Sequence, residues 1–392
     1  MKDDKRLFNN TPREYNLSLS VNKVNEGKTF AFITLLRGVT VLLIAWDHMV
    51  GAWLDWSKVV WMPLEFVRQY ITRPLGIIQD FGAIGVSFLF LMSGFLITHI
   101  GQTENRKEFS IKRLLRIYPP LIVSIILILA FYWIYAIITQ SHTYVQDFNL
   151  QAILLGASLL NYFFWPQNVL NGIAWILVVE GLFYIACFIL LPFLKTRPQT
   201  SVALLLAFTG FVIVFSRELG ISFLLFASSV AYFPFIIMGQ ILFYFWKRRI
   251  TRVGFAFFSA TAMLLFVLGV MMVNTDFLPI NNSYIISFVY AYVIFGVSLL
   301  LAKRIKVGRF LGFFSKISYS FYLNQTYCYL WFVVLLPILG VEFSIGTIFV
   351  LLTFIAYLSW RFVENPSRKL ARRILGPVRS PDDANAKGQI HP

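Results

Sequence analysis

Long apolar stretches separated by short polar breaks run through most of the printed sequence. Each stretch is long enough, or nearly long enough, to cross the hydrocarbon core of a bilayer as a helix. The thinnest break, at residues 216–220, separates the fifth stretch from the sixth. The pattern predicts an all-α, polytopic integral membrane protein with about ten transmembrane helices, at residues 30–51, 79–100, 119–139, 171–193, 201–216, 223–246, 253–273, 283–302, 316–338 and 344–361.

Composition supports this class of protein. Hydrophobic residues make up 58% of the 392 residues and charged residues only 13%, which is more apolar surface than a soluble domain of this size buries. The two cysteines, Cys187 and Cys328, fall in separate apolar stretches. The sequence therefore predicts neither a disulfide framework nor a metal site.

The formal net charge of +16 could indicate a nucleic-acid partner, but the positions of the basic residues indicate membrane topology instead. If the N-terminus is cytoplasmic, Lys and Arg gather in the two tails and the even-numbered loops, as the positive-inside rule requires. The exceptions are Arg37, Lys58, Arg68, Arg73 and Arg217. We therefore predict cytoplasmic N- and C-termini, the lipid bilayer as a partner, and no nucleic acid.

The chain divides into one membrane domain and two polar tails. Residues 1–29 form a basic N-terminal tail that lacks the apolar core of a cleaved signal peptide. Residues 30–366 are the predicted transmembrane domain. Residues 367–392 form a second basic tail, which we expect to be cytoplasmic and disordered. Any chemistry then has to come from the membrane domain and its short loops.

Two ionisable residues, Arg37 and His48, lie inside the first apolar stretch. An Arg at the centre of a membrane helix costs about 2.5–3.5 kcal/mol even on the lenient insertion scale. Eleven residues turn a helix through about 1100°, so both side chains point the same way, about 16 Å apart. Asp47 adds a third ionisable group beside a natural general base. The alternative is a snorkelling arginine and an interfacial histidine.

A basic segment precedes the third apolar stretch. Arg113 and Arg116 are three residues apart and share a face if the segment is helical, and Pro119 and Pro120 predict that the span begins there. Two guanidinium groups at the cytoplasmic mouth of a span would bind a phosphate-bearing ligand. The alternative is an ordinary positive-inside anchor.

Glu180 is a carboxylate in the otherwise apolar segment 172–184. Such a group normally marks a functional or paired site, and Arg37 and His48 are its candidate partners. A structural ion pair is the alternative. Ser93, in the second span, belongs to a small Ser-Gly surface that is typical of close helix packing, and we include it among the candidate donor-binding residues.

Together these residues resemble the acyltransferase-3 family of integral membrane acyltransferases. The resemblance extends from the first span to the last. Two departures stand out: Ile176 replaces the usual Ser after Trp175, and Asn324-Gln325 stands where a His often follows Leu323. The matching elements are Arg37 and His48, residues 88–97, Arg113 with Arg116, Ile117 and Pro119, then Trp175 with Glu180, Phe183 and Tyr184, residues 317–323 and residues 361–366.

The resemblance implies transfer of an acyl group, often acetyl, from cytoplasmic acyl-CoA to a hydroxyl of a surface polysaccharide or lipid-linked glycan, in the bacterial cytoplasmic membrane and without a metal. Arg113 and Arg116 would hold the nucleotide phosphates, and the donor arm would pass Arg37. His48 would act as general base, with Asp47 or Glu180 fixing its tautomer; an acyl-histidine intermediate is the other route. A transporter or flippase of a glycan or lipid intermediate, and a non-catalytic scaffold, are the alternative functions.

Overall fold

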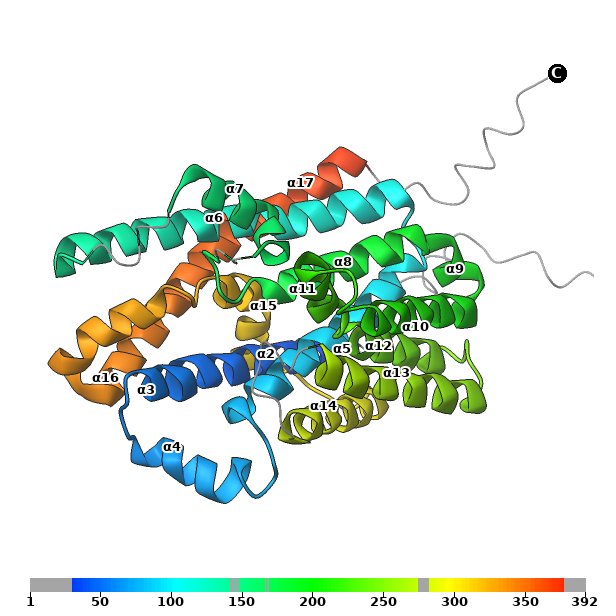
Figure 1. Ribbon diagram of the computed structural model, residues 1–392, viewed down its shortest axis with the longest axis horizontal. Helices are drawn as coiled ribbons and strands as arrows, with labels where there is room; N and C mark the ends of the chain where they lie inside the picture. Colours follow the sequence, from blue (N-terminus) through cyan, green and yellow to red (C-terminus); the bar gives the residue numbers. More distant parts are fainter. Residues whose placement is uncertain are drawn as a thin grey trace, which may run out of the picture.

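The computed structural model describes residues 30–141, 145, 148–165, 167, 169–273 and 282–376, and all its regular elements are helices. The predicted N-terminal tail, residues 1–29, lies outside the described residues, as do residues 377–392. Most of the long helices run in roughly the same direction, side by side (Figure 1). The predicted all-α fold is therefore confirmed for the described part of the chain.

The first membrane helix is unusually long because three helical segments join end to end. α2 (Ala31–Trp46) continues without a break into the π-helical segment η1 (Asp47–Ala52) and then into α3 (Trp53–Trp56). A π-helical turn inside an α-helix is often found at a functional site. Here the wide turn begins at two of the candidate site residues, Asp47 and His48.

Three further helices pack directly on α2 or on its neighbours. These are α5 (Gly82–Gly101), α12 (Phe233–Trp246) and α15 (Arg309–Leu323). A Cβ on Gly94 of α5 would collide with the carbonyl oxygen of Ile236, and one on Gly239 of α12 would collide with that of Leu91. Glycine lets these two backbones touch, so the predicted role of the Ser93-Gly94 surface in helix packing is confirmed.

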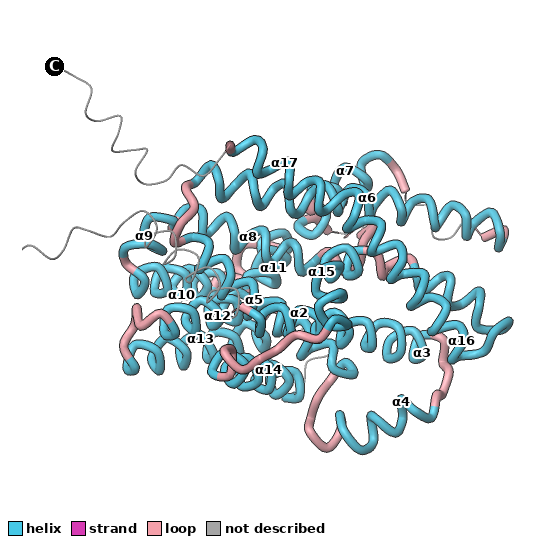
Figure 2. Tube along the Cα trace, turned by 180° about the vertical axis from the view of Figure 1, so that it is seen from behind, coloured by secondary structure: helices cyan, strands magenta, loops and turns pink. Residues whose placement is uncertain are grey.

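The other helices surround this core. Figure 2 shows the same bundle from behind, with α13 and α14 on one flank and α6 and α17 on the other. In chain order they are α4 (Met62–Val67), η2 (Arg68–Thr72), η3 (Gln79–Phe81), α6 (Arg106–Thr139), α7 (Leu150–Ser158), η4 (Leu160–Phe163), α8 (Trp175–Ile189), α9 (Leu191–Thr196), α10 (Pro198–Val214), α11 (Ile221–Val230), α13 (Arg252–Met272), α14 (Asn282–Leu300), α16 (Cys328–Ser359), η6 (Trp360–Glu364) and α17 (Asn365–Leu375).

Each of the ten predicted spans contains a helix, but they differ in length. Among the described residues, six helices are long and apolar enough to cross a membrane. α8, α10 and the described part of α14 are apolar but shorter, and α15 has only 15 residues. The structure is that of a multi-pass membrane protein, whereas ten crossings and cytoplasmic termini stay predictions.

The prediction that the third span begins at Pro119 or Pro120 is wrong. α6 begins at Arg106, and both prolines lie inside it. Asn105 and Glu108 form a reciprocal capping box at its start, a sequence signal that fixes the true N-terminus. Inside a membrane bundle, neighbouring helices can satisfy backbone groups near a proline; here the Tyr319 hydroxyl of α15 donates to the Ile117 carbonyl (3.0 Å).

Two other boundaries differ from the sequence analysis. The ninth predicted span, 316–338, is divided between the end of α15 and the start of α16, and the tenth lies in the second half of α16, which bends at Gly340, where φ is +75°. The predicted disordered tail from residue 367 begins as helix α17, which ends at Leu375. Its charged residues alternate with apolar ones at helical spacing, so this segment forms an amphipathic helix instead of an irregular tail.

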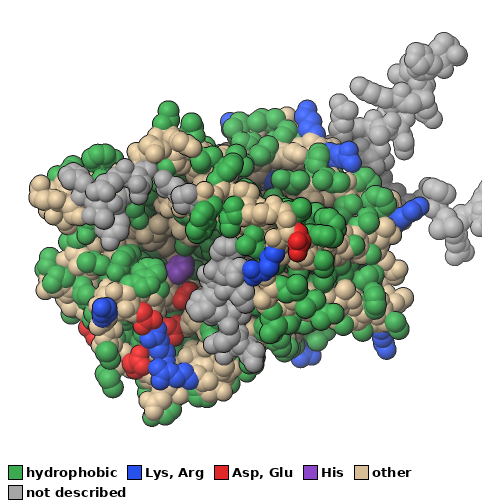
Figure 3. Space-filling view, viewed as in Figure 1, with side chains coloured by type: hydrophobic (Ala, Val, Ile, Leu, Met, Phe, Trp, Pro, Cys, Tyr) green, Lys and Arg blue, Asp and Glu red, His purple; other side chains and the backbone are tan. Residues whose placement is uncertain are grey.

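Apolar side chains cover most of the face in Figure 3, as a lipid-facing surface requires. Basic side chains gather at the end of the molecule that carries α9, which we call the tail end (Figures 1 and 3). A mixed group of acidic and basic side chains lies toward the opposite end, which we call the far end and which carries α3 and α4 (Figures 1 and 3).

Candidate active site

One face of the first helix carries the candidate site residues. Arg37, Ile44 and His48 all line cavities inside the bundle, and Ile44 lines both the cavity that contains Arg37 and the one that contains His48. The prediction that Arg37 and His48 face the same way is therefore confirmed. The face belongs to the interior of the protein, so neither residue is a lipid-facing anchor.

The cavity nearest the tail end, which we call the arginine cavity, is small and strongly charged. Its volume is about 40 Å³. Three helices supply its guanidinium groups and its carboxylate: Arg37 from α2, Arg113 and Arg116 from α6, and Glu180 from α8. Ser93 of α5 also lines it. The structure therefore brings together five of the seven candidate residues.

Arg113 is held firmly within this cavity. Its guanidinium contacts Glu104 (3.4 Å) and lies over the rings of Phe109 (4.9 Å to the centroid) and Tyr184 (5.9 Å). Its buried Nε has no hydrogen-bond partner among the described residues. Such a group is costly unless a ligand or water satisfies it. The arrangement fits a site that is completed by an anionic ligand.

A second cavity of about 70 Å³, which we call the middle cavity, adjoins the first. Arg37, Arg116 and Glu180 line both cavities. Glu180 accepts a hydrogen bond from the Tyr184 hydroxyl (3.2 Å). Tyr319 of α15 also lines the middle cavity, so α15 closes the path on the side opposite α5 and α8.

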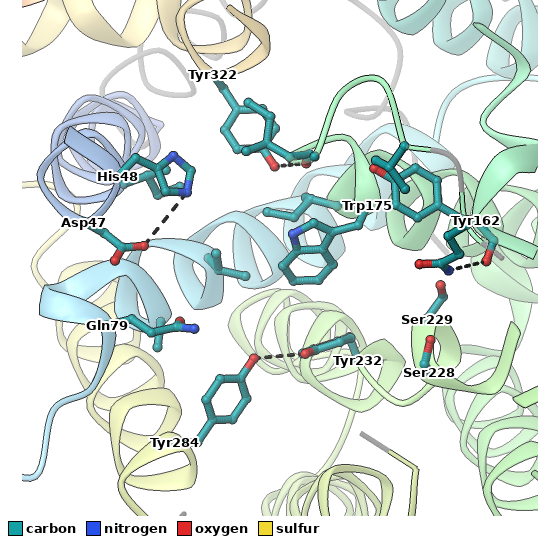
Figure 4. A pocket seen from close by; sticks show the side chains of 18 of the residues that line it. Asp47, His48, Gln79, Tyr162, Trp175, Ser228, Ser229, Tyr232, Tyr284 and Tyr322 are labelled. Atoms are coloured by element: carbon teal, nitrogen blue, oxygen red, sulfur yellow. Dashed lines mark hydrogen bonds and ion pairs between the residues drawn. The ribbon is translucent and has the colours of Figure 1, made fainter. Parts of the chain in front are cut away.

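A third cavity, which we call the histidine cavity, has a volume of about 460 Å³ and is lined by His48 and Asp47. Figure 3 shows a hollow on this face with histidine and acidic side chains in it. Ile44, Ile176 and Tyr322 line both this cavity and the middle one, so they form a neck between the two. Figure 4 shows the other labelled side chains around it, which are aromatic or carry hydroxyl and amide groups: Gln79, Tyr162, Trp175, Ser228, Ser229, Tyr232 and Tyr284.

The imidazole of His48 is oriented by Gln325, a residue that the sequence analysis noted only as a departure. The Oε1 atom of Gln325 lies 2.5 Å from Nδ1 of His48. An amide oxygen can only accept, so Nδ1 carries the proton and Nε2 is left with a free lone pair. Nε2 lies 3.9 Å from Oδ2 of Asp47, on the side of the cavity (Figure 4).

Glu180 does not take the role beside His48 that the sequence suggested. It lines the arginine and middle cavities, whereas His48 lines the histidine cavity. Its charged neighbours are Arg37 and Arg116, with which it interacts electrostatically. Helical spacing within α8 could not reveal this, because the position of α8 along the bundle axis decides which end of the path Glu180 reaches.

An ionic network lies at the rim of the histidine cavity. Arg68 of η2 contacts Asp55 (2.7 Å), Asp80 (2.6 Å) and Glu65 (3.2 Å). Hydrogen bonds to Asp55 and Asp80 hold the pKa of Arg68 above its usual range, so the guanidinium stays charged at any physiological pH. Sequence reasoning missed this network because its members come from four separate elements, α3, α4, η2 and η3.

Among the described residues, no group of three or more His, Cys, Asp and Glu side chains could hold a metal ion. Tyrosines also line the histidine cavity. Burial raises the pKa of one of them, Tyr162, whose hydroxyl donates to the carbonyl of Asn171 (2.8 Å). Apart from tyrosines, the ionisable side chains that the described residues bring to this cavity are those of His48 and Asp47.

Comparison with known protein families identifies the family of the chain. The sequence profile of the acyltransferase-3 family, described as an acyltransferase domain, matches residues 30–360. The chain belongs to the acyltransferase-3 family. The matched region contains all three cavities and every candidate site residue. No curated protein and no solved structure matches the chain, so the geometry of this acyltransferase-3 member has to be read from its own residues.

Family membership gives the general activity, which is acyl transfer in a membrane. The two departures noted in the sequence now have positions. Ile176 lies in the neck between the middle and histidine cavities, and Gln325 contacts the imidazole. Both changes therefore fall on the path between the arginine cluster and His48.

Proposed function

We propose that the protein is a membrane O-acyltransferase that uses an acyl-CoA donor and acylates a hydroxyl of a surface polysaccharide or lipid-linked glycan. Arg113, Arg116 and Arg37 bind the donor at the tail end, and His48 is the general base. The single observation that carries the proposal is the path itself. Three adjoining cavities link a cluster of arginines to a histidine with an available lone pair.

The chemistry of the arginine cavity fits a phosphate-bearing donor. Arginine forks bind phosphate oxygens by paired, charge-assisted hydrogen bonds. Arg37, Arg113 and Arg116 face one carboxylate in this cavity, Glu180, so an anion is favoured there. The cavity itself is too small for a nucleotide, which supports a geometry in which phosphates sit at the mouth and the slender pantetheine arm enters the path.

The reaction needs one proton acceptor and no net proton release. Nε2 of His48 takes the proton of the acceptor hydroxyl while the oxygen attacks the thioester carbonyl. The carbon–sulfur bond then breaks, and the imidazolium returns the proton to the departing thiolate. Gln325 keeps the proton on Nδ1 throughout, so Nε2 stays available. A two-step route, in which Nε2 of His48 first accepts the acyl group, uses the same arrangement.

Acyl transfer by the purified protein tests this function. The full chain in lipid nanodiscs would be incubated with radiolabelled acetyl-CoA or succinyl-CoA and a panel of methyl hexopyranosides, with mass spectrometry of the products. We expect release of free CoA thiol and a labelled ester on the sugar. Absence of transfer from every acyl-CoA, in a preparation of intact fold, would contradict the donor assignment and favour another acyl donor.

One observation favours the alternative function, a transporter of a glycan or lipid intermediate. The break between α11 and α12 places Tyr232 at the wall of the histidine cavity, and transporters often build their sites at interrupted helices. Pro234 lies in the first turn of α12 and Gly239 at the contact with α5, so neither breaks the helix. Flux of a labelled glycan through proteoliposomes without acyl-CoA would support the transporter.

A further inference from the structure

The histidine cavity contains a polar side chain for which neither the family nor the reaction gives a role. We propose that the carboxamide of Gln79 recognises the acceptor, a polyhydroxylated uncharged molecule, and that Arg68 positions it through Asp80. This inference rests on the proposed function, because it assigns the substrate-recognition group of the same cavity.

Gln79 lines the histidine cavity close to Asp47 and Tyr284 (Figure 4). Its carboxamide has no hydrogen-bond partner among the described residues. Gln167, the other glutamine that lines the cavity, differs in this respect because its Nε2 donates to the carbonyl of Tyr162 (3.0 Å). Gln79 therefore offers one acceptor and two donor positions to a molecule inside the cavity.

The backbone that carries Gln79 is strained. Gln79, Asp80 and Phe81 have φ values of +53°, +42° and +80°, three consecutive left-handed residues without a glycine. L-residues adopt this region rarely, and such strain persists only where the surrounding structure imposes it. A turn with glycine at these positions would join η2 to α5 without strain. The presence of residues with side chains instead indicates that these side chains have a role.

The surrounding contacts fix this turn from two sides. Nε and Nη2 of Arg68 donate to the carboxylate of Asp80 (3.0 and 2.6 Å), and Asp55 holds the other edge of the guanidinium. On the opposite side, the backbone N–H of Ile78 donates to Oγ of Ser287 (3.2 Å). The residues directly before and after Gln79 are thus both anchored, while its own side chain is left free.

The remaining wall indicates what the carboxamide would meet. Trp175, Tyr232 and Tyr284 present aromatic surfaces, and Ser228 and Ser229 present hydroxyl groups. A carboxamide can bridge neighbouring hydroxyl groups by donating to one and accepting from the other. No Lys or Arg among the described residues lines the cavity, so an acceptor whose recognised part is anionic would find no counter-charge from them. The chemistry favours an uncharged sugar ring.

The test measures acceptor and donor constants separately in nanodiscs, with a methyl hexopyranoside that the wild type acylates. We expect Gln79→Ala to raise the acceptor KM at least tenfold while the donor KM changes less than twofold. Gln151→Ala, at an exposed position of α7, is the matched control and should leave both constants unchanged. A monodeoxy sugar that lacks the bridged hydroxyl should lose affinity for the wild type but not for Gln79→Ala.

Arg68→Lys tests the positioning role, because it keeps the charge and loses the fork. It should raise the acceptor KM about fivefold in the wild type and have no further effect in Gln79→Ala. Additive effects in this double-mutant cycle would mean that Arg68 only supports the fold. An unchanged acceptor KM in Gln79→Ala would overturn the inference while leaving the proposed function intact. If the wild type itself transfers nothing from acyl-CoA, the proposed function fails first.

Discussion

The two ends of the path differ in size and charge. The arginine cavity has a volume of about 40 Å³ and is lined by three arginines, whereas the histidine cavity has a volume of about 460 Å³ and is lined by aliphatic, aromatic, hydroxyl and amide side chains beside His48 and Asp47. The charge of the arginine cavity fits a small number of strong contacts to an anion. The larger wall of the histidine cavity fits many weak contacts to a bulky neutral molecule. Under the proposed function, the two ends of one bundle bind the donor and the acceptor separately.

The largest expected effect comes from removing the base. His48→Ala should lower kcat by about 10²- to 10⁴-fold, the usual contribution of general acid–base catalysis, with little change in the KM of the donor. His99→Ala is the matched control because His99 packs against Phe30 and Phe243, away from the three cavities. Activity near the wild-type level in the His48 variant would show that His48 is not the general base. The arginine cavity and the histidine cavity would then not be linked by the proposed reaction.

Removing the charge at the other end should change donor binding. Arg113→Ala combined with Arg116→Ala should raise the donor KM by about 10²- to 10⁴-fold, since each charge-assisted hydrogen bond contributes about 1.5–3 kcal/mol. The measurement is the KM of the donor and of the acceptor in the same preparation. Arg252→Ala with Arg304→Ala, two exposed arginines at the start of α13 and in the turn after α14, should leave both constants unchanged. An equal rise of both constants would contradict the separation of the two ends.

Glu180→Gln tests whether the carboxylate between the arginines matters for catalysis or only for packing. The amide keeps the size of the side chain and removes the charge that offsets Arg37 and Arg116. We expect kcat to fall about tenfold, because roughly 1.4 kcal/mol of positioning energy corresponds to that factor. Turnover equal to that of the wild type would assign Glu180 to the packing of α8.

Gln325 gives a pH-dependent test of the imidazole. Gln325→Ala should lower kcat about tenfold, because the Nδ1 proton loses its acceptor. Gln325→Glu should instead move the acidic limb of the pH–rate profile to higher pH. A carboxylate beside the ring favours the protonated imidazole, which cannot act as a base, so activity is lost at a pH where the wild type still works. An unshifted profile would contradict the assignment of His48 as the base.

The smallest expected effect concerns the neck between the cavities. Ile176→Ala removes part of a side chain that lines both the middle and the histidine cavities. We expect the preference for acetyl over butyryl donors to fall about fivefold, because one or two methylene groups in an apolar pocket contribute about 1–3 kcal/mol. The ratio of kcat/KM for the two donors measures it. An unchanged ratio would mean that the acyl group does not pass this neck.

The common face of Arg37 and His48 could be predicted from the sequence because it depends only on the period of one helix. The start of α6 was predictable in principle from Asn105 and Glu108, but the prolines that follow are a stronger local signal for a helix start and indicate the wrong boundary. Membrane helices keep prolines inside because neighbours satisfy the backbone, which a single stretch of sequence does not reveal.

The contacts that complete the site could not be predicted in this way. His48 and Gln325 are 277 positions apart. They follow α2 and α15 in the chain, and the packing of these two helices against each other brings them together. The turn at Gln79 contains no glycine that would mark a left-handed backbone in the sequence. Arg68, which holds this turn through Asp80, lies on another element. Long-range contacts and imposed backbone strain are properties of the folded bundle, so local patterns in the sequence do not predict them.

The π-helical segment η1 has a consequence for anyone who edits this chain. A π-turn accommodates one residue more than an α-turn over the same length, so removal of a single residue between Met49 and Ala52 would let the helix close up as regular α-helix. Everything after the deletion would then keep its orientation and its position along the helix axis. Trp53 would keep its ring contact with Phe332, now 5.6 Å between centroids, and the seam between the first helix and α16 would stay closed.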